Sequence, residues 1–246
     1  MNQSENPGNV AGATPDDDPR LFPRVTAYRS RGGDLRPGQQ RNWQEHWATY
    51  GRNVADELVD QQALFGRTAP LIVEIGSGTG TSTAAMAAAE PGIDVIAVEV
   101  YQTGLAQLLG MLLRQGIENV RMVRGDGVDV LTNMIAPASL TGIRVFFPDP
   151  WPKARHHKRR LLQPSTFGLF ASRLRPGGVL HVATDHVDYA EWIGPTGDAE
   201  PALERLDAVT EARHVPFSLE RPVTKFEGKG LQEERVINEF LWRRRE

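Results

Sequence analysis

Residues 71–80 read L-I-V-E-I-G-S-G-T-G, an apolar strand pattern that runs directly into three glycines. The small residues of 81–89 follow at once and predict a helix, which Pro91 and Gly92 end. Glycine permits tight backbone turns and lets a ligand approach the main chain closely. In open α/β sheets, such a turn forms part of the ligand site at the carboxyl ends of the strands. The stretch therefore predicts the first strand–turn–helix unit of a ligand-binding α/β domain.

The same alternation of strand and helix patterns continues along the chain. We expect strands at residues 71–75, 94–100, 120–123, 143–147 and 179–184, separated by helices at 81–89, 101–114, 128–135, 165–174 and 186–193. Such alternation indicates a mostly parallel sheet with helices on both faces. Nearer the C-terminus, 201–213 favours a helix, whereas 216–219 and 235–242 favour strands that form a hairpin at the sheet edge. The sequence therefore predicts an α/β fold with a mostly parallel seven-stranded sheet and an antiparallel edge strand.

The N-terminal region divides into segments of different composition. Residues 1–20 are rich in Gly, Pro, Asn and Asp and almost free of large apolar side chains, which predicts a disordered acidic tail. Residues 21–41 hold five arginines against one acid, Asp34, and predict a basic flexible arm that is either a solvated loop or a contact for phosphates. Apolar residues at helical spacing over 39–59 predict an amphipathic helix packed on a larger domain. We expect this domain to be a single unit of residues 42–246.

The net charge alone argues against a nucleic-acid partner, because 28 Lys and Arg face 31 Asp and Glu. Four of those acids lie in residues 1–18, which contain no Lys or Arg, so the remaining chain has a balance of 28 − 27 = +1. Cations that cluster locally bind polyanions, so their distribution is a better guide than their sum.

The cysteine content and the apolar runs of the sequence indicate where the protein is located. The chain contains no cysteine, which excludes disulfides, cysteine-ligated zinc and a thiol nucleophile. Its first twenty residues hold no apolar run of the kind found in signal peptides. No window approaches the roughly 18 consecutive apolar residues of a membrane span. These features predict a soluble, cytoplasmic protein without a membrane partner.

Acidic residues accompany three successive strands. Glu74 precedes the glycines, Glu99 ends the second expected strand and Asp126 follows the third. The third glycine comes two residues after the second, whereas the dinucleotide fingerprint requires three. Any one acid could be an ordinary surface residue, but together they suit a ribose, an adenine amino group and an amino-acid ammonium. This favours S-adenosylmethionine over NAD. The predicted cofactor-binding residues here are Glu74, Gly76, Gly78, Gly80, Glu99 and Asp126.

A second informative stretch is 145–160, which reads V-F-F-P-D-P-W-P-K-A-R-H-H-K-R-R. An apolar strand end turns at two prolines that bracket one carboxylate, Asp149. The most basic run of the chain follows, with five cations within eight residues. Such a run is suited to phosphate contacts, although a solvated helix start has the same composition. Trp151 is suited either to stacking on a base or to capping the core.

Three stretches carry a resemblance to a known family: E-I-G-S-G-T-G at 74–80, F-F-P-D-P-W-P-K-A-R-H-H-K-R-R at 146–160 and R-P-V-T-K-F-E at 221–227. In content, order and spacing they resemble the bacterial tRNA (guanine-N7-)-methyltransferases, over about residues 25–243. Many methyltransferases share the first stretch, and the other two are far more specific. The resemblance implies a class I methyltransferase (Rossmann-like) fold that uses S-adenosylmethionine to methylate N7 of a guanine in the tRNA variable loop.

The resemblance also implies roles for particular residues. Asp149 would be the catalytic residue and would join the acids of the S-adenosylmethionine site. The implied substrate contacts are Lys153, Asp185, Thr224, Lys225, Phe226 and Glu227. The implied RNA contacts are Arg155, His156, His157, Lys158, Arg159 and Arg160. The chain departs from the family pattern after Glu227, where Lys229 replaces the Arg of an Arg-Gly pair and a later Gly-His is missing. This leaves the contacts of that segment open.

The implied reaction mainly requires that the protein position the guanine and the cofactor correctly. Guanine N7 carries an exposed lone pair and no proton, so neither a general base nor a metal ion is required. The enzyme has to align N7, the methyl carbon and the sulfur in one line. A fixed carboxylate at Asp149 can grip the guanine N1 and N2 protons and hold the product ring, which becomes cationic.

Two other functions stay open from the sequence. A methyltransferase of the same fold could act on another RNA base or a small molecule, and the turn 148–151 is similar to a motif of enzymes that methylate exocyclic amines of bases. A small-molecule substrate leaves the basic residues 155–160 without a purpose. A non-catalytic RNA-binding module could retain the cofactor pocket, but the complete set of acids around the glycine turn argues against it.

Overall fold

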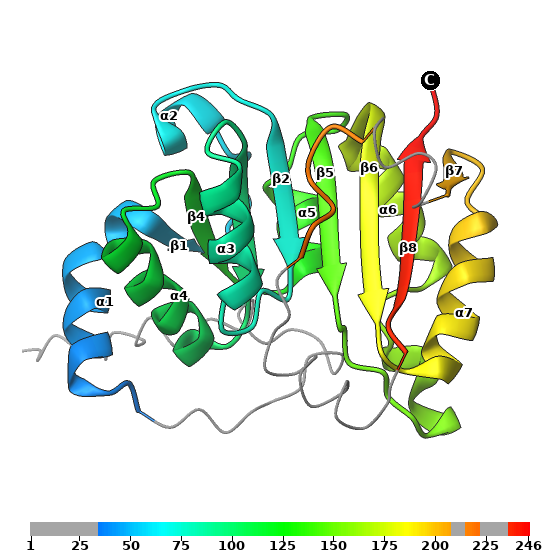
Figure 1. Ribbon diagram of the computed structural model, residues 1–246, viewed down its shortest axis with the longest axis horizontal. Coiled ribbons are helices and arrows are strands. Elements are labelled where there is room, and N and C mark those ends of the chain that lie inside the picture. Colours follow the sequence, from blue (N-terminus) through cyan, green and yellow to red (C-terminus); the bar gives the residue numbers. More distant parts are fainter. Residues whose placement is uncertain (1–33, 208–214, 222–235) are drawn as a thin grey trace, which may run out of the picture.

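In the part of the chain that the structure describes, eight strands form one sheet (Figure 1). The computed structural model describes residues 34–207, 215–221 and 236–246. The strands are β1 (Gly51–Asn53), β2 (Leu71–Ile75), β3 (Asp94–Glu99), β4 (Val120–Arg124), β5 (Leu140–Phe146), β6 (Leu174–Thr184), β7 (Leu203–Leu206) and β8 (Asn238–Arg244). Their order is β1-β4-β3-β2-β5-β6-β8-β7. The first six pair in parallel, and β8 runs antiparallel to both of its neighbours, β6 and β7.

Helices cover both faces of this sheet. They are α1 (Pro37–Tyr50), α2 (Gln61–Phe65), α3 (Thr81–Ala89), α4 (Gln102–Gln115), α5 (Gly127–Asn133), α6 (Pro164–Arg173) and α7 (Val187–Asp198). On one face, α3 and α4 pack through residues such as Ala84 and Leu108, and α1 lies outside α4 (Figure 1). On the other face, α5, α6 and α7 contribute Val130, Phe167 and Ile193 to the main core. Every residue of β2 is buried, as expected for a central parallel strand covered on both faces.

The predicted α/β fold is confirmed, but the sheet has one more strand than expected. The helix expected over 39–59 is α1, which begins at Pro37 within the expected arm and ends at Tyr50. Gly51 then enters β1, and a Cβ at this position would lie 2.2 Å from the ring of Trp47. The aromatic side chains of α1 pack on the core cluster of α4, as predicted for an amphipathic helix. The short strand β1 pairs with β4 and is one of two strands that the sequence did not predict.

Two expectations for the C-terminal region are wrong. Part of the expected helix over 201–213 is the strand β7, because pairing with β8 overrides the helical spacing of its two buried leucines. Residues 216–219 are not a strand. The segment 215–221 crosses one face of the sheet (Figure 1), and Phe217 packs where Gly142 leaves room for its ring. The expected hairpin is therefore absent among the described residues, and β8 pairs with β6 and β7 instead.

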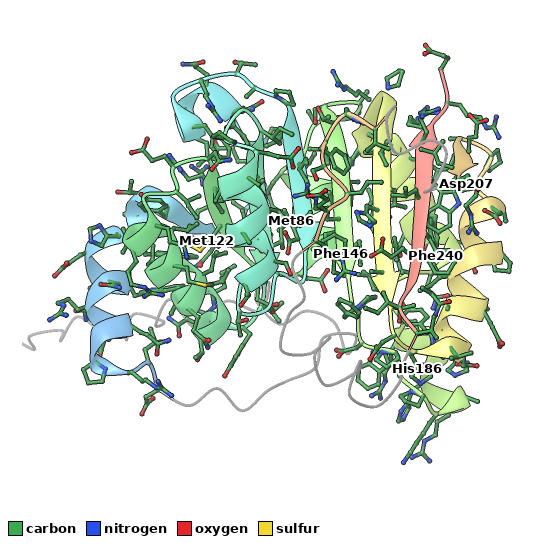
Figure 2. All side chains as sticks on the ribbon, viewed as in Figure 1. Met86, Met122, Phe146, His186, Asp207 and Phe240 are labelled. Carbon is green, nitrogen blue, oxygen red and sulfur yellow. The ribbon has the colours of Figure 1, made fainter. Side chains whose placement is uncertain are left out.

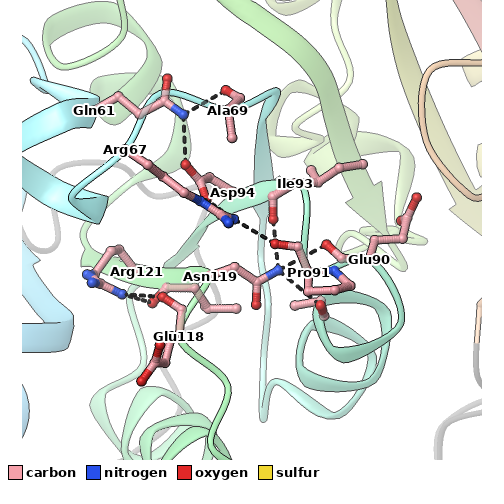
Figure 3. A network of polar contacts seen from close by, with 12 residues as sticks. Gln61, Arg67, Ala69, Glu90, Pro91, Ile93, Asp94, Glu118, Asn119 and Arg121 are labelled. Carbon is pink, nitrogen blue, oxygen red and sulfur yellow. Dashed lines mark hydrogen bonds and ion pairs between the residues drawn. The ribbon is translucent and has the colours of Figure 1, made fainter.

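A buried carboxylate anchors the amino end of β3, opposite to the glycine turn (Figure 3). Asp94 accepts hydrogen bonds from Arg67 Nε at 2.9 Å, Arg67 Nη2 at 2.6 Å and Gln61 Nε2 at 2.9 Å. Nearby, Asn119 Nδ2 donates to three main-chain carbonyls between residues 87 and 93. These bonds fix α2, which the sequence did not predict, and the end of α3. These contacts hold the amino end of β3 in place. The carboxyl ends of the parallel strands, at the opposite end of the sheet, are left to form the site.

Candidate active site

The turn between β2 and α3 has a left-handed backbone at each of its three glycines. The φ angles are 77° at Gly76, 57° at Gly78 and 75° at Gly80. Residues other than glycine rarely adopt such angles. A Cβ at Gly76 or Gly78 would meet no described atom within 4 Å, so the main chain there faces open space. A Cβ at Gly80 would lie 2.5 Å from the Leu108 side chain. The turn therefore offers exposed backbone to a ligand while it packs tightly where α3 begins.

Glu99, at the end of β3, holds the glycine turn through its main chain. Its Oε2 accepts a hydrogen bond from Gly78 N at 2.9 Å. Its Oε1 accepts from Val100 N at 2.8 Å and from Tyr101 N at 3.0 Å. Burial raises the pKa of Glu99 above its usual range, although these backbone hydrogen bonds oppose the rise. The carboxylate is thus fixed beside the turn.

Two buried polar atoms at the turn lack a hydrogen-bond partner among the described residues: Glu74 Oε2 and Ser77 Oγ. The other oxygen of Glu74, Oε1, accepts from Thr83 Oγ1 at 2.9 Å. Burial raises the pKa of Glu74, and the nearby Arg144 and the bond from Thr83 counteract it. Buried polar groups are nearly always paired, so these two atoms suit a polar ligand. Sequence reasoning singled out Glu74 but missed Ser77, whose only signal was its place between two glycines.

Asp126 follows β4 and begins α5. It is buried, and its Oδ1 accepts a hydrogen bond from Val128 N at 2.8 Å as a helix cap. Because β2, β3 and β4 are parallel and adjacent, Glu74, Glu99 and Asp126 lie at or next to one edge of the sheet. The structure therefore brings these three acids together beside the glycines, and their individual contacts with a cofactor stay predictions.

Asp149 is the exposed residue of a half-buried turn after β5, and the backbone is strained on both sides of it. The φ angle is 51° at Phe147 and 44° at Trp151, a region that disfavours bulky side chains. Phe147 N donates to Ala183 O at 2.8 Å, which ties the turn to β6. Burial is the main cause of the raised pKa of Glu99, and the charge of Asp149 adds to it. Because β5 runs parallel to β2 and next to it, Asp149 lies at the same end of the sheet as the glycine turn.

The basic run forms a short 3₁₀ helix, Ala154–Arg159, directly after this turn. Three of the cations are exposed: Lys153, Arg155 and Lys158. The Arg159 guanidinium lies 5.1 Å from the centroid of the Trp151 ring, and the His156 ring meets the same indole edge-on at 5.8 Å. Desolvation, and then the surrounding cations, lower the pKa of His156 below its usual range. The helix therefore presents a cationic surface, and His156 within it loses its proton more readily than an isolated histidine.

Arg160 differs from the other cations of the run, because it is 2% exposed. Its Nε donates to Pro150 O at 2.9 Å, its Nη2 donates to Asp188 of α7, and its guanidinium lies 4.7 Å from the Tyr189 ring centroid. His157 Nε2 also lies 3.8 Å from Asp188 Oδ2. This burial argues against the expected RNA contact of Arg160. Sequence reasoning could not separate Arg160 from its neighbours, because all of them are basic.

The end of β6 contributes Asp185 to the same edge. His186, labelled in Figure 2, follows it and begins α7, where its Nδ1 accepts from Tyr189 N at 3.4 Å. Four of the expected substrate contacts lie outside the described residues: Thr224, Lys225, Phe226 and Glu227.

The described segment 215–221 ends just before those four residues. Arg221 Nη2 donates to Glu239 Oε1 of β8 at 2.6 Å. The Arg221 guanidinium lies 5.3 Å from the ring centroid of Phe146 and 5.1 Å from that of Phe147. The chain is thus pinned beside the Asp149 turn at the point where it leads to residues 222–227.

Among the described residues, no group of three or more His, Asp or Glu side chains is arranged to hold a metal ion. In the same part of the chain, no helix is both long and apolar enough to cross a membrane.

The fold and this edge define a class of protein. The solved 16S rRNA methyltransferase KamB matches with a TM-score of 0.52 at 15% identity, over 77% of this chain and 95% of that chain. At this identity the likeness shows the fold alone. The fold is that of the class I methyltransferases.

The family follows from sequence comparison. Residues 68–240 match the family described as "Putative methyltransferase". A tRNA (guanine-N(7)-)-methyltransferase of Nocardia farcinica is 59% identical over 229 residues, which cover 91% of this chain and 85% of that protein. The enzyme of the same name from Corynebacterium jeikeium is 52% identical over 251 residues, which cover 100% of this chain and 99% of that protein. This chain belongs to the tRNA (guanine-N7-)-methyltransferase family, as its motifs predicted.

Proposed function

We propose that this protein transfers the methyl group of S-adenosylmethionine to N7 of a guanine in the variable loop of tRNA. The observation that carries the proposal is the shared edge: the glycine turn, the acids Glu99 and Asp126, the Asp149 turn and the basic 3₁₀ helix all lie at the carboxyl ends of neighbouring parallel strands. Because the proposed substrate is tRNA, we expect the enzyme to act in the cytoplasm.

The residues at the turn fit S-adenosylmethionine. The open backbone at Gly76 and Gly78 leaves room for a ligand, and the unpaired Glu74 Oε2 and Ser77 Oγ offer it polar partners. Glu99 and Asp126 would hold the ribose and the adenine. The bound cofactor supplies an electrophilic methyl group on a positively charged sulfur.

Asp149 would orient the guanine rather than remove a proton from it. Its carboxylate is an acceptor for the guanine N1 and N2 protons, and its negative charge favours a ring that becomes cationic at N7. The left-handed residues Phe147 and Trp151 and the two flanking prolines restrict the turn, so this carboxylate is held before the substrate arrives. Asp185 and residues 224–227 would complete the grip on the base.

The exposed cations around the 3₁₀ helix would bind tRNA phosphates and set the register of the RNA. The side chains that can reach RNA are the exposed ones, Lys153, Arg155 and Lys158. Arg160 is buried. Trp151 is already covered by Arg159 and His156, which favours packing over base stacking for this indole.

The test is methyl transfer from labelled S-adenosylmethionine to an unmodified tRNA transcript, followed by digestion to nucleosides. We expect the label in 7-methylguanosine and none in a transcript whose variable-loop guanine is replaced. Label in another nucleoside contradicts the target atom. Efficient methylation of free guanosine, unchanged when Lys158 and Arg159 are reversed to Glu, would instead support a small-molecule enzyme.

A further inference from the structure

A groove between α1 and α4 opens beside the glycine turn. Its volume is about 510 Å³. One wall is the first part of α1, from Arg36 to Asn42, and the other is the face of α4 between Ala106 and Arg114. Thr79 and Thr81 of the glycine turn close one end. The groove is thus next to the proposed active site but is formed by helices that the proposed chemistry does not use.

Three arginines line this groove: Arg36, Arg41 and Arg114. Among the described residues, no Asp or Glu lines it. All three residues are exposed, and none forms an ion pair with another described residue. Like charges gathered around one cavity repel one another, and an anion between them removes that cost. The groove therefore has the charge of an anion site.

The shape of the groove depends on Gly110 in α4. A Cβ at this position would lie 3.1 Å from Arg114 Nη1 and 3.8 Å from Asn42 Nδ2. The missing side chain lets the Arg114 guanidinium lie back along its own helix, next to the amide of Asn42. The first turn of α1 adds the positive end of a helix dipole. Guanidinium and amide groups thus line one space next to the start of a helix, as suits phosphate recognition.

The position of the groove suits a long polyanion. α1 begins at the end of the sheet toward which β2, β5 and β6 run, which is the end that carries Asp149 (Figure 1). In the strand order, β3 and β4 with α4 lie on one side of β2, and β5 with the basic 3₁₀ helix lies on the other. The two cationic surfaces therefore flank the glycine turn.

We propose that the α1–α4 groove binds backbone phosphates of the tRNA whose guanine lies at Asp149. The inference rests on the proposed function, which supplies the polyanion. Two other anions are alternative occupants: the carboxylate of S-adenosylmethionine, because Thr79 and Thr81 of the glycine turn also line the groove, and the acidic residues 16–18 of the chain. Three separated guanidinium groups in a groove of this size fit successive phosphates better than one carboxylate.

The test compares the full-length protein with a triple variant, Arg36→Ala, Arg41→Ala and Arg114→Ala. The control is Arg175→Ala, an exposed arginine at the opposite end of the sheet, where β6 begins. Binding of tRNA is measured over a range of salt concentrations without cofactor, and binding of S-adenosylmethionine is measured separately. A second triple variant with Lys at the same positions keeps the charge.

We expect the alanine variant to bind tRNA about 10- to 100-fold more weakly, with a salt slope lower by about 3, because each phosphate contact that is lost leaves about one counterion unreleased. The Lys variant should regain most of this affinity, and Arg175→Ala should match the wild type. S-adenosylmethionine affinity and kcat at saturating tRNA should stay unchanged.

Unchanged or tighter tRNA binding by the alanine variant overturns the proposal and favours the acidic tail as the occupant. A loss of S-adenosylmethionine affinity also overturns it, because the arginines then serve the cofactor. Failure of the proposed function is a separate outcome: the wild-type protein itself would then leave tRNA unmethylated.

Discussion

Arg160 Nε donates a 2.9 Å hydrogen bond to the carbonyl oxygen of Pro150, the residue directly after Asp149. The same guanidinium binds Asp188 and lies over the ring of Tyr189, so α7 holds it in place. The last cation of the basic run is therefore a support for the turn that presents the proposed catalytic carboxylate. We infer that Arg160 is a positioning residue.

Arg160→Ala should lower kcat by about 100-fold, because a small displacement of Asp149 spoils the alignment of the reacting atoms. The affinity for tRNA and its salt slope should change little. Arg160→Lys should remain impaired, since an ammonium cannot make the forked contacts of a guanidinium. Steady-state methylation and tRNA binding measure both effects.

The matched control for Arg160 is the exposed Lys158 of the same run. Lys158→Ala should weaken tRNA binding and reduce its salt slope while kcat at saturating tRNA stays close to wild type. If Arg160→Ala behaves in this same way, its guanidinium contacts RNA and the positioning role is wrong.

Stability below neutral pH should depend on Glu239. His181, and then Arg221, hold the pKa of this carboxyl at about 2, below its ordinary value of 4.5. A folded-state pKa below the unfolded value stabilises the protein fully above pH 4.5, and this contribution is lost as the pH falls from 4.5 to 2. Urea unfolding of Glu239→Gln should therefore show lower stability at pH 7 and a weaker fall over that window.

The control for Glu239 is Glu191→Gln on the exposed face of α7, which should follow the wild-type curve. The neighbouring His181 is fully buried, and burial lowers its pKa below 6.5, so it adds a loss of stability that begins as the pH falls below 6.5. A Glu239→Gln curve parallel to wild type between pH 4.5 and 2 would show that the contacts of Glu239 with His181 and Arg221 do not stabilise the fold.

Gly80→Ala should destabilise the protein by about 2–4 kcal/mol, because it combines a positive φ with a collision against the buried Leu108. Gly38→Ala is the matched control. It lies in the first turn of α1 with nothing within 4 Å of a Cβ, so it should leave stability unchanged or raise it by up to about 1 kcal/mol. Chemical unfolding measures both, and equal stability of the two variants would contradict the tight packing at Gly80.

The sequence predicted the central elements of the fold well because each buries a long apolar pattern. The helix over 81–89 has the same bounds in the structure, and β2 has the predicted residues 71–75. The elements that were missed or misassigned are short and depend on partners far away in the chain. β1 and α2 have three and five residues, and β7 is a strand because β8 pairs with it.

The site was predictable as far as topology determines it. Parallel strands end at one edge, so the acids after successive strands had to lie near each other. The directions of individual side chains were not predictable. Arg160 is buried because α7 supplies Asp188, 28 residues later, and the α1–α4 groove exists because two helices distant in sequence pack side by side. Neither contact leaves a local pattern.

Asp149→Asn isolates the charge of the proposed catalytic residue. The amide keeps nearly the same shape and one oxygen acceptor, but it loses the negative charge that holds a cationic product ring. We expect kcat to fall by about 10²–10³-fold, comparable to the loss of one preorganised polar group from other active sites. The affinity for tRNA should stay within a few-fold of wild type, because the cationic 3₁₀ helix is not altered. The affinity for S-adenosylmethionine is measured separately, because the family resemblance also assigns Asp149 to the cofactor site. Asp149→Glu keeps the charge but moves it by one methylene, so its activity should lie between those of the wild type and Asp149→Asn. Full activity of Asp149→Asn in single-turnover methylation would show that the charge is dispensable and that Asp149 serves only as a hydrogen-bond acceptor.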